Sequence, residues 1–471
     1  MTFENDTPWA LLTDLYELTM AQSYVQEGMF EQATFSLFTR TLPTNRSYIV
    51  SSGLGNVLTY LANVHFSSED IRYLQSTELF NSKFLDYLYN FRFTGEVWAI
   101  PEGCLGFAEE PLAEVTAPVP EAQIIESFLI NQINFQSAIA TKAARCVWAA
   151  EGRPVVDFSL RRTHGIDAAL KAARSSYIAG CESTSNVLAG KWYGIPITGT
   201  MAHSFITSFS DEIESFRAYA RSFPDDTVLL IDTYDTLTGV RNAIVVAKEM
   251  ENSGHRLRAV RLDSGDLLEL SKQVRAILDG EGLDYVRILV SGGLDEYRLE
   301  DLIKTGAAID GFGVGTRMGV SSDAPYFDMA YKLVEFGGRP VLKLSTGKTS
   351  LVNPKQVYRC TDSDGQFSND VLALRNESAP ALGKPLLEKV MDAGGIIAPL
   401  PTLNETRERF KKEFSLLPQK FKELQNPPEY PVVLSRGLQE LQSQTEQRIA
   451  MQTSGLAQVG CTIDPRTCSM G

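Results

Sequence analysis

Short apolar runs alternate with longer amphipathic stretches through the middle of this chain, from about residue 153 onward. The apolar runs are rich in Val, Ile and Leu, which is typical of strands buried on both faces of a sheet. They occupy residues 154–158, 195–199, 227–232, 258–262, 287–291 and 311–315. The stretches between them repeat apolar residues every three or four positions, which predicts helices with one buried face. They include 166–177, 210–222, 237–252 and 267–278.

Strand–helix units that repeat at this spacing predict a parallel sheet with helices packed against it. Polar residues or glycines follow nearly every apolar run at the same end, which favours a sheet rolled into an irregular α/β barrel. In such a barrel the chemistry lies at the carboxyl ends of the strands. An open, doubly wound parallel sheet is the alternative that the pattern leaves.

The pattern is irregular on both sides of this central region. Before it, we expect a helix over 11–26, a strand over 34–40, extended segments over 95–117 and a long helix over 123–150. After it, we expect strands over 331–336 and 340–344 and a helix over 405–424. Residues 451–471 form a short C-terminal tail that contains Gly and Ser.

The composition, with 44% hydrophobic and 22% charged residues, is that of an ordinary soluble globular protein, and 471 residues predict two or three domains. The formal net charge of −14 argues against a general nucleic-acid or membrane-surface role, although it allows a local basic pocket. No apolar run approaches the ~20 residues of a membrane span, and the N-terminus has no signal-peptide pattern. The six cysteines show no zinc-site spacing, which favours reduced thiols and a cytoplasmic location.

Charged residues follow several of the predicted strands. Arg161 and Arg162 come after the first, where two adjacent guanidinium groups suit a carboxylate or phosphate ligand, with a surface ion pair as the alternative. Asp232 comes after the third, and Asp263 comes after the fourth, in the sequence Arg-Leu-Asp-Ser-Gly-Asp that begins at Arg261. These carboxylates suit ribose hydroxyls or Mg²⁺, or else the N-caps of the following helices. For Asp266 we expect an N-cap or a supporting role.

Two glycine-rich turns follow the last two predicted strands. Ser-Gly-Gly ends at Gly293, and Gly-Val-Gly-Thr-Arg begins at Gly313. Glycine-rich turns that open helices expose backbone N–H groups, and the helix dipole adds positive potential, so such turns bind phosphate. Two of them in adjacent strand–helix units predict a phosphate site late in the barrel.

His203 stands after the second predicted strand, at the start of a helix-like stretch, and is one of only four histidines in the chain. Its imidazole titrates near neutral pH and is a competent nucleophile. Taken by itself, His203 has an alternative interpretation as a polar strand-end residue that is hydrogen-bonded to backbone and has no catalytic role. Together, the arginines, the acid, the glycine turns and the histidine describe a pocket for phosphoribosyl transfer to a small aromatic acid.

Six stretches of the chain resemble the nicotinate phosphoribosyltransferase family, and the similarity runs from residue 13 to about 358. The stretches are 13–20, 157–162, 199–204, 261–266, 291–294 and 313–317. The resemblance implies a type II phosphoribosyltransferase fold, in which an N-terminal α/β domain completed by C-terminal segments packs on an irregular α/β barrel. We expect the N-terminal domain over 1–140 together with about 345–450, and the barrel with the active site over 141–344.

The resemblance also implies the reaction. Nicotinate and 5-phosphoribosyl 1-diphosphate would give nicotinate mononucleotide and diphosphate, with ATP hydrolysis coupled to the transfer, and the product would feed NAD biosynthesis. Mg²⁺ is the implied cofactor and ATP the co-substrate. The implied assembly is a homodimer with shared active sites, and neither nucleic acid nor a membrane is an expected partner.

Roles for individual residues follow from the same resemblance. ATP would transiently phosphorylate His203, Arg261 would engage the nicotinate carboxylate or the sugar phosphate, and Asp263 would hold ribose hydroxyls or the metal. Tyr16, from the neighbouring subunit, and Phe158 would stack on the pyridine ring, with core aromatics as the alternative. Further contacts with the substrates would come from Arg161, Ser185 and Ser204. The 5′-phosphate would be bound by Gly292, Gly293, Gly313, Gly315 and Thr316. Weaker candidates for binding diphosphate or ATP, with solvated surface cations as the alternative, are Arg40, Arg317 and Lys343.

Three other functions compete with this one. The related enzymes that use nicotinamide place an acidic side chain beside the amide, whereas the corresponding position here is Ser185, whose neutral hydroxyl tolerates a carboxylate. Quinolinate phosphoribosyltransferases are shorter and lack the phosphohistidine. A catalytically silent binding protein on the same scaffold is the third alternative, and the intact set of His203, Arg261 and Asp263 argues against it.

Overall fold

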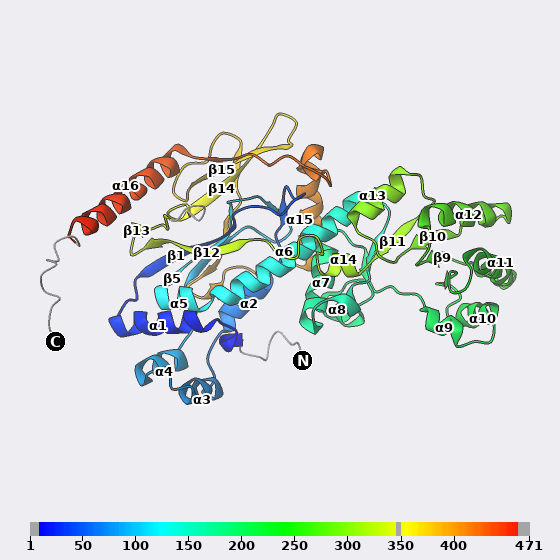
Figure 1. Ribbon diagram of the computed structural model, residues 1–471, viewed down its shortest axis with the longest axis horizontal. Coiled ribbons are helices and arrows are strands. Elements are labelled where there is room, and N and C mark those ends of the chain that lie inside the picture. Colours follow the sequence, from blue (N-terminus) through cyan, green and yellow to red (C-terminus); the bar gives the residue numbers. More distant parts are fainter. Residues whose placement is uncertain (1–8, 345–349, 460–471) are drawn as a thin grey trace, which may run out of the picture.

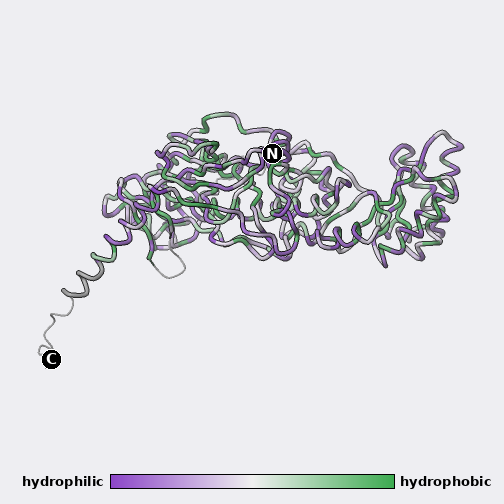
Figure 2. The backbone as a smooth tube through the Cα atoms, turned by 90° about the horizontal axis from the view of Figure 1, so that it is seen from above, coloured by the Kyte–Doolittle hydropathy of each residue, from purple (hydrophilic) through white to green (hydrophobic). Residues whose placement is uncertain are grey.

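The computed structural model describes residues 9–344 and 350–459, with side chains described through residue 452. The molecule is elongated (Figure 1). Segments from both ends of the chain form one half around an antiparallel sheet, and the middle of the chain forms the other half around a parallel sheet. Seen from above, the two halves lie end to end along the long axis (Figure 2).

A seven-stranded antiparallel sheet, in the order β13-β12-β1-β5-β3-β17-β18, organises the first half. Its strands are β1 (Gln32–Thr39), β3 (Glu96–Ala99), β5 (Pro111–Pro118), β12 (Met329–Phe336), β13 (Arg339–Pro340), β17 (Glu388–Asp392) and β18 (Gly395–Ile396). At its centre, Leu37 of β1 lies opposite Tyr331 of β12 on one side and Ala113 of β5 on the other. C-terminal segments therefore complete the N-terminal α/β domain, as predicted, while the residue numbers at which the domains divide stay a prediction.

Helices and further strands pack around this sheet. The helices are α1 (Leu15–Glu27), α2 (Leu54–Asn63), α3 (Ser68–Ser76), α4 (Ser82–Tyr89) and α5 (Val119–Ile124), with the 3₁₀ turn η1 (Trp9–Leu11). A second sheet, β16-β14-β15-β19, contains β14 (Lys355–Thr361), β15 (Phe367–Leu374), β16 (Gly383–Pro385) and β19 (Val432–Leu434), and β2 (Ile49–Val50) pairs with β4 (Leu105–Gly106). Leu18 of α1, Leu37 of β1 and Val357 of β14 share one hydrophobic core, so β1 is buried along nearly its whole length.

One long helix, α6 (Glu126–Ala149), runs between the two halves (Figure 1). Leu129 and Ile133, early in the helix, pack in the core of the antiparallel half. Ala140 and Ala143, later in the helix, pack in the core of the parallel half. The helix therefore belongs to both cores and fixes one half against the other.

The second half is built on a six-stranded parallel sheet in the order β7-β6-β11-β10-β9-β8. Its strands are β6 (Val155–Asp157), β7 (Ser183–Thr184), β8 (Val228–Leu230), β9 (Ala259–Leu262), β10 (Arg287–Val290) and β11 (Gly311–Val314). The first strand pairs beside the last, with Val156 opposite Gly313, so the sheet curls back on itself as a half-barrel. This confirms the prediction of an irregular α/β barrel over an open doubly wound sheet.

The predicted strand over 195–199 was wrong. In the described part of the chain this segment makes only an isolated bridge, in which Ile197 pairs with Thr184 of β7. Pro196 has no N–H to donate, so the segment does not extend into a regular ladder. The short strand β7 takes the place beside β6, and sequence patterning missed it because two residues carry no periodic signal.

Helices connect the parallel strands on the outside of the half-barrel. They are α7 (Ile166–Ile178), α8 (Val187–Tyr193), α9 (His203–Thr207), α10 (Glu212–Ser222), α11 (Thr236–Asn252), α12 (Leu267–Gly280), α13 (Glu296–Lys304) and α14 (Thr316–Gly319), with the 3₁₀ turn η2 (Leu160–Arg162). Asp266 accepts hydrogen bonds from the N–H groups of Leu268 and Glu269, so its prediction as an N-cap is confirmed.

The C-terminal region contains α15 (Leu403–Leu416), η3 (Gln419–Lys422) and α16 (Arg436–Val459). The helix predicted over 405–424 ends at Leu416, because Pro418 lacks an N–H and restricts the residue before it. The predicted tail is helical through Val459, and its remainder, 460–471, lies outside the described residues. Within the described ranges, four cysteines are free and buried, and no helix is long and apolar enough to cross a membrane.

Candidate active site

A cavity of about 460 Å³ opens at the carboxyl ends of the parallel strands. Its walls come from the segments that follow β6, β7, β9, β10 and β11, which is where a parallel barrel gathers functional side chains. The cavity is lined by Phe158, Leu160, Arg161, Arg162, Ser185, Gly199, Thr200, Met201, Ala202, Arg261, Asp263, Ser291, Gly292, Gly293, Gly313, Gly315 and Thr316. The structure thus brings together most of the residues that the sequence predicts for the site.

Arg261, on β9, is held in place by hydrogen bonds to several segments. Its Nε donates to Ser291 Oγ at 3.0 Å, and its Nη2 donates to Asp263 Oδ1 at 3.1 Å. Its Nη1 donates to Thr200 Oγ1 and to the Met201 carbonyl oxygen, the latter at 3.2 Å. The planar guanidinium group suits this multiple bonding, and its orientation is fixed before any ligand arrives.

Asp263 is a carboxylate that its surroundings keep ionised. Burial alone would raise the pKa of this carboxyl, but the hydrogen bond from Ser291 and the charge of Arg261 lower it below its ordinary value. Its backbone N–H donates to Asp232 Oδ2 at 2.9 Å. A negative charge held this firmly can accept hydrogen bonds from sugar hydroxyls or approach a cation.

Phe158 and Gly313 illustrate why the cavity has a flat apolar wall. A Cβ atom on Gly313 would lie 2.5 Å from the Phe158 ring, so only glycine lets this ring lie against β11. The Arg261 guanidinium carbon lies 5.8 Å from the centre of the same ring. An aromatic face next to a fixed cation is a suitable surface for a planar, negatively charged ring.

The turn after β10 needs glycine for two different reasons. Gly292 has φ +90°, and a Cβ there would lie 2.0 Å from the carbonyl oxygen of Asp263. Gly293 has φ +64° with open space around it. The two left-handed residues allow the backbone to pass close to Asp263 while its N–H groups stay accessible.

His203 is the first residue of α9 and directly follows the lining segment 199–202. Its Nδ1 is 3.1 Å from Thr233 Oγ1, and the ring is half-buried. The charge of His203 is the smallest of the causes that lower the pKa of the Asp263 carboxyl. With Nδ1 bonded to Thr233, the other ring nitrogen remains for chemistry.

Asp157, at the end of β6, is buried and supports the wall of the cavity that carries Phe158 and Ser185. Its Oδ1 accepts from the N–H of Ser159 at 2.9 Å, and its Oδ2 accepts from Thr184 Oγ1 at 2.7 Å. Its backbone carbonyl accepts from the N–H of Ser185 at 2.9 Å. Burial raises the pKa of the Asp157 carboxyl above its ordinary value. This residue therefore orients the turns that carry Phe158 and Ser185.

Other predicted site residues lie away from the walls of this cavity. Tyr16 is 46% exposed on α1, in the antiparallel half. Arg40 lines a second cavity of about 290 Å³, and its Nη1 is 3.7 Å from Asp328 Oδ2. Ser204 is exposed on α9, and Lys343 is exposed after β13.

Arg317, on α14, is paired with a carboxylate. Its Nη1 donates to Asp295 Oδ2 at 2.5 Å, and Asp295 is the N-cap of α13. The pair thus connects the segments that follow the two glycine turns.

Sequence reasoning missed the residues that hold the ligand-facing side chains. Ser291 is the clearest case, because it bonds to both Arg261 and Asp263. Its signal is present in the sequence as a hydroxyl at the end of a buried strand, beside the two glycines. Thr233, after β8, carries the same kind of signal and contacts His203, whereas its neighbour Asp232, a carboxylate expected after the third strand, bonds to the backbone of Asp263.

Mg²⁺ is the cation that the family resemblance implies, and carboxylates beside the cavity are the side chains that suit it. Among the residues described, no three His, Cys, Asp or Glu side chains gather as a complete metal site. Mg²⁺, however, takes one or two carboxylates and completes its shell with phosphate oxygens and water. Asp232 Oδ1 is buried without a hydrogen-bond partner in the described structure, next to the backbone of Asp263. The two carboxylates therefore fit a magnesium ion that arrives with a phosphorylated substrate.

Comparisons with known proteins give a consistent result over nearly the whole chain. Models of the nicotinate phosphoribosyltransferase N-terminal domain, family and C-terminal domain match residues 11–134, 154–365 and 379–442. A nicotinate phosphoribosyltransferase of Mycobacterium tuberculosis is 49% identical over 428 residues, which cover 90% of this chain and 91% of the relative. One of Bacillus subtilis is 37% identical over 462 residues, which cover 91% and 94%.

Solved structures agree. The crystal structure of human nicotinic acid phosphoribosyltransferase matches with a TM-score of 0.83 and 30% identity, over 92% of this chain and 99% of that one. The half-barrel and its strand-end cavity are thus those of a phosphoribosyltransferase. This chain belongs to the nicotinate phosphoribosyltransferase family.

Proposed function

We infer that the protein joins nicotinate to 5-phosphoribosyl 1-diphosphate, giving nicotinate mononucleotide and diphosphate for NAD salvage. The observation that carries this inference is that stretches far apart in the sequence converge on one cavity with a fixed arginine, an ionised carboxylate and two glycine turns. Membership of the family supports the same reaction. The four buried free cysteines support a cytoplasmic location.

The transfer itself asks little covalent chemistry of the protein. The ring nitrogen of nicotinate attacks the anomeric carbon with its lone pair, and the bond from that carbon to the diphosphate breaks with both electrons leaving on oxygen. Because the nitrogen already has a free lone pair, no general base is needed. The transition state resembles an oxocarbenium ion, so the protein acts by positioning the reactants and neutralising charge.

Nicotinate binds, in this proposal, with its ring against Phe158 and its carboxylate toward Arg161 and Arg261. The flat wall that Gly313 allows, with Arg261 above the ring, supports this orientation. The partner subunit's Tyr16 would cover the other ring face in a homodimer with shared sites. The exposed position of Tyr16 on α1, outside this chain's own cavity, supports such sharing.

The sugar diphosphate occupies the rest of the cavity. Asp263 accepts hydrogen bonds from ribose hydroxyls, and backbone N–H groups of the two glycine turns, with Thr316, bind the 5′-phosphate. Ser204 is a candidate substrate contact. Arg40, Arg317 and Lys343 are weaker candidates for diphosphate or ATP contacts. Asp263 and Asp232 would hold Mg²⁺, which, when bound, neutralises charge on the diphosphate.

Ser185 favours nicotinate over nicotinamide. Its side chain is uncharged and lines the cavity on the wall shared with Phe158. An acidic residue here would repel the nicotinate carboxylate, whereas a hydroxyl accepts it. The alternative substrate, nicotinamide, is therefore disfavoured by the charge of this wall.

ATP would drive the reaction through His203. Imidazole Nε2, left free by the Thr233 contact at Nδ1, attacks the γ-phosphorus of ATP, and the bond to the bridging oxygen breaks to release ADP. Water later cleaves the N–P bond and releases phosphate. Incubation with γ-labelled ATP tests this: wild type should retain label and His203→Ala should not. Label retained equally by His203→Ala contradicts the phosphohistidine.

Product analysis tests the reaction and its ATP coupling together. Purified protein is incubated with nicotinate, the sugar diphosphate and Mg²⁺, with ATP present or absent, and nucleotide products are separated by chromatography. We expect more nicotinate mononucleotide with ATP than without. Turnover that ATP leaves unchanged would favour a quinolinate-type enzyme, and no turnover under any condition would favour a silent binding protein.

A further inference from the structure

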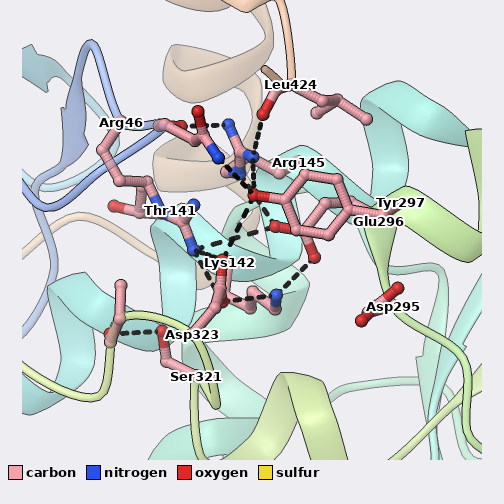
Figure 3. Close-up of polar contacts among 12 residues, drawn as sticks. Arg46, Thr141, Lys142, Arg145, Asp295, Glu296, Tyr297, Ser321, Asp323 and Leu424 are labelled. Carbon is pink, nitrogen blue, oxygen red and sulfur yellow. Dashed lines mark hydrogen bonds and ion pairs between the residues drawn. The ribbon is translucent and has the colours of Figure 1, made fainter. Parts of the chain in front are cut away.

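A buried cluster of charged side chains includes residues from the segments that follow the two glycine turns (Figure 3). It contains the cations Arg46, Lys142 and Arg145 and the carboxylates Glu296 and Asp323. The side chains of the three cations and Glu296 are at most 1% exposed. Buried charges are tolerated only when each is paired closely, so the arrangement of these groups is strongly constrained.

Lys142, on α6, bonds to one carboxylate from each turn segment. Its Nζ is 2.6 Å from Asp323 Oδ1 and also contacts Glu296 Oε2. Glu296 begins α13, directly after the turn that contains Gly293. Asp323 follows α14, which begins after Gly315. A single ammonium group therefore connects the two segments that leave the phosphate cradle.

Two arginines extend this connection to segments from both ends of the chain. Arg46 Nη2 lies 3.0 Å from both Asp323 oxygens and 3.7 Å from Glu296 Oε1. Arg145 Nε donates to Glu296 Oε1 at 2.9 Å, and its other nitrogens donate to the carbonyls of Asn45 and Leu424. The carboxylates are thus tied, through these arginines, to α6 and to the segments that contain Asn45 and Leu424 (Figure 3).

Asp323 and Lys142 hold opposite charges near neutral pH. Burial opposes ionisation of Asp323, but Arg46 and Lys142 lower the pKa of its carboxyl to about 2. Burial likewise acts to lower the pKa of the Lys142 ammonium, and the charge of Glu296 raises it above its ordinary value. Lys142 and Asp323 therefore form a charged pair beside the turn segments.

The Arg317–Asp295 pair forms a second link nearer the cavity. Asp295 is two residues beyond Gly293, and Arg317 is one residue beyond Thr316, which lines the cavity. The Arg317 side chain is 52% exposed and that of Asp295 8% exposed. This partly exposed pair connects the same two turn segments that Lys142 connects in the interior of the protein.

We propose that Lys142 is a positioning residue for the sugar phosphate: by bonding to Glu296 and Asp323 it sets the spacing of the two glycine turns, so that N–H groups of both reach one phosphate. The inference rests on the proposed function for the identity of that ligand. Turns built on glycines are free to move, and a misplaced cradle loses binding steeply. The Arg317–Asp295 pair supports the same spacing.

Lys142→Met tests the interior link, and Lys171→Met is its control, because Lys171 is also mostly buried but pairs with Asp167 on its own helix. Calorimetry with 5-phosphoribosyl 1-diphosphate should show a Kd raised about tenfold or more for Lys142→Met, with the KM for nicotinate within about twofold. A merely structural role would lower the melting temperature and leave both constants unchanged. That result would overturn the proposal.

A double-mutant cycle at the exposed pair covers the case in which Lys142→Met does not fold. Arg317→Ala and Asp295→Asn should raise the Kd for 5-phosphoribosyl 1-diphosphate by similar factors, and the double variant should add little. Arg298→Ala is the control, because its partner Asp301 lies on the same helix. Weaker binding in Arg317→Ala alone would assign Arg317 to its other candidate role, direct contact with the diphosphate, and would overturn the proposed link.

These measurements separate the positioning role from the reaction. The positioning role alone is overturned if wild-type protein turns over nicotinate and every variant binds the sugar diphosphate normally. Wild-type protein that binds the sugar diphosphate but does not use nicotinate overturns the proposed function. In that case the variants still test the spacing of the turns through the Kd.

Discussion

Arg261 Nη2 donates to Asp263 Oδ1 at 3.1 Å, across the end of strand β9. The two residues are separated by one position, so both side chains leave the strand on the same side. Ser291, from the next strand, bonds to both of them. The cation proposed for nicotinate and the anion proposed for the sugar are therefore fixed relative to each other without a ligand.

Arg261→Lys should lower kcat/KM for nicotinate roughly 100-fold, because an ammonium cannot bond to Ser291, Thr200 and Asp263 at once. Steady-state assays with both substrates varied provide the measurement. Arg258→Lys is the matched control, since Arg258 precedes the same strand and is paired on the surface with Asp226. Equal effects of the two changes would contradict the role of Arg261.

Gly313→Ala should raise the KM for nicotinate roughly tenfold, because the new Cβ displaces the Phe158 ring from β11. The Kd for 5-phosphoribosyl 1-diphosphate should change less. Gly280→Ala is the control, because Gly280 ends α12 with open space around it. An unchanged KM for nicotinate in Gly313→Ala would show that the ring is not part of the nicotinate site.

Ser185→Asp should reduce nicotinate use by roughly tenfold or more, since a carboxylate at this wall repels that of the substrate. Ser185→Ala, which adds no charge, should keep most of the activity. The ratio of kcat/KM for nicotinate and nicotinamide is the measurement. A ratio that is the same in the Asp variant and in wild type would remove Ser185 from the determinants of specificity.

Glu17 should make stability depend on pH in an unusual direction. Its carboxyl accepts hydrogen bonds from Ser127, and burial raises its pKa from 4.5 to about 7. The folded state therefore binds this proton more tightly than the unfolded chain. The contribution of this proton to the free energy of unfolding is complete below pH 4.5 and is lost as the pH rises through 7.

Urea unfolding of Glu17→Gln across this range tests that contribution. The variant should lose less stability than wild type between pH 5 and pH 8, because its amide does not titrate. Glu69→Gln, which changes an exposed glutamate on α3, should behave like wild type. The same pH dependence in Glu17→Gln and wild type would contradict the assignment.

Much of the cavity could be predicted because parallel strands end at one edge of their sheet. Arg161 and Asp263 each follow a recognisable buried strand, Gly313 lies near the end of one, and the fold brings all three together without further information. A barrel implies that β6 pairs with β11, but the register of this pair has no local signal, because it joins the first and last of the predicted strands. The contact of Gly313 with Phe158 depends on that pairing.

Other features left no local signal. Lys142 lies in an alanine-rich stretch of α6, and its partner Asp323 is 181 residues away. Pro196 and Pro418 did carry a signal, and each ended an element that apolar periodicity alone had extended. Supporting residues are difficult to predict because their function is defined by long-range neighbours.

Competition between the two pyridine substrates tests the central claim most directly. Purified protein is incubated with nicotinate and nicotinamide at equal concentrations, together with 5-phosphoribosyl 1-diphosphate, Mg²⁺ and ATP, and both mononucleotides and diphosphate are quantified over time. We predict nicotinate mononucleotide with one diphosphate for each molecule formed, and little nicotinamide mononucleotide. Nicotinamide mononucleotide as the main product, or no nucleotide at all, would contradict the account.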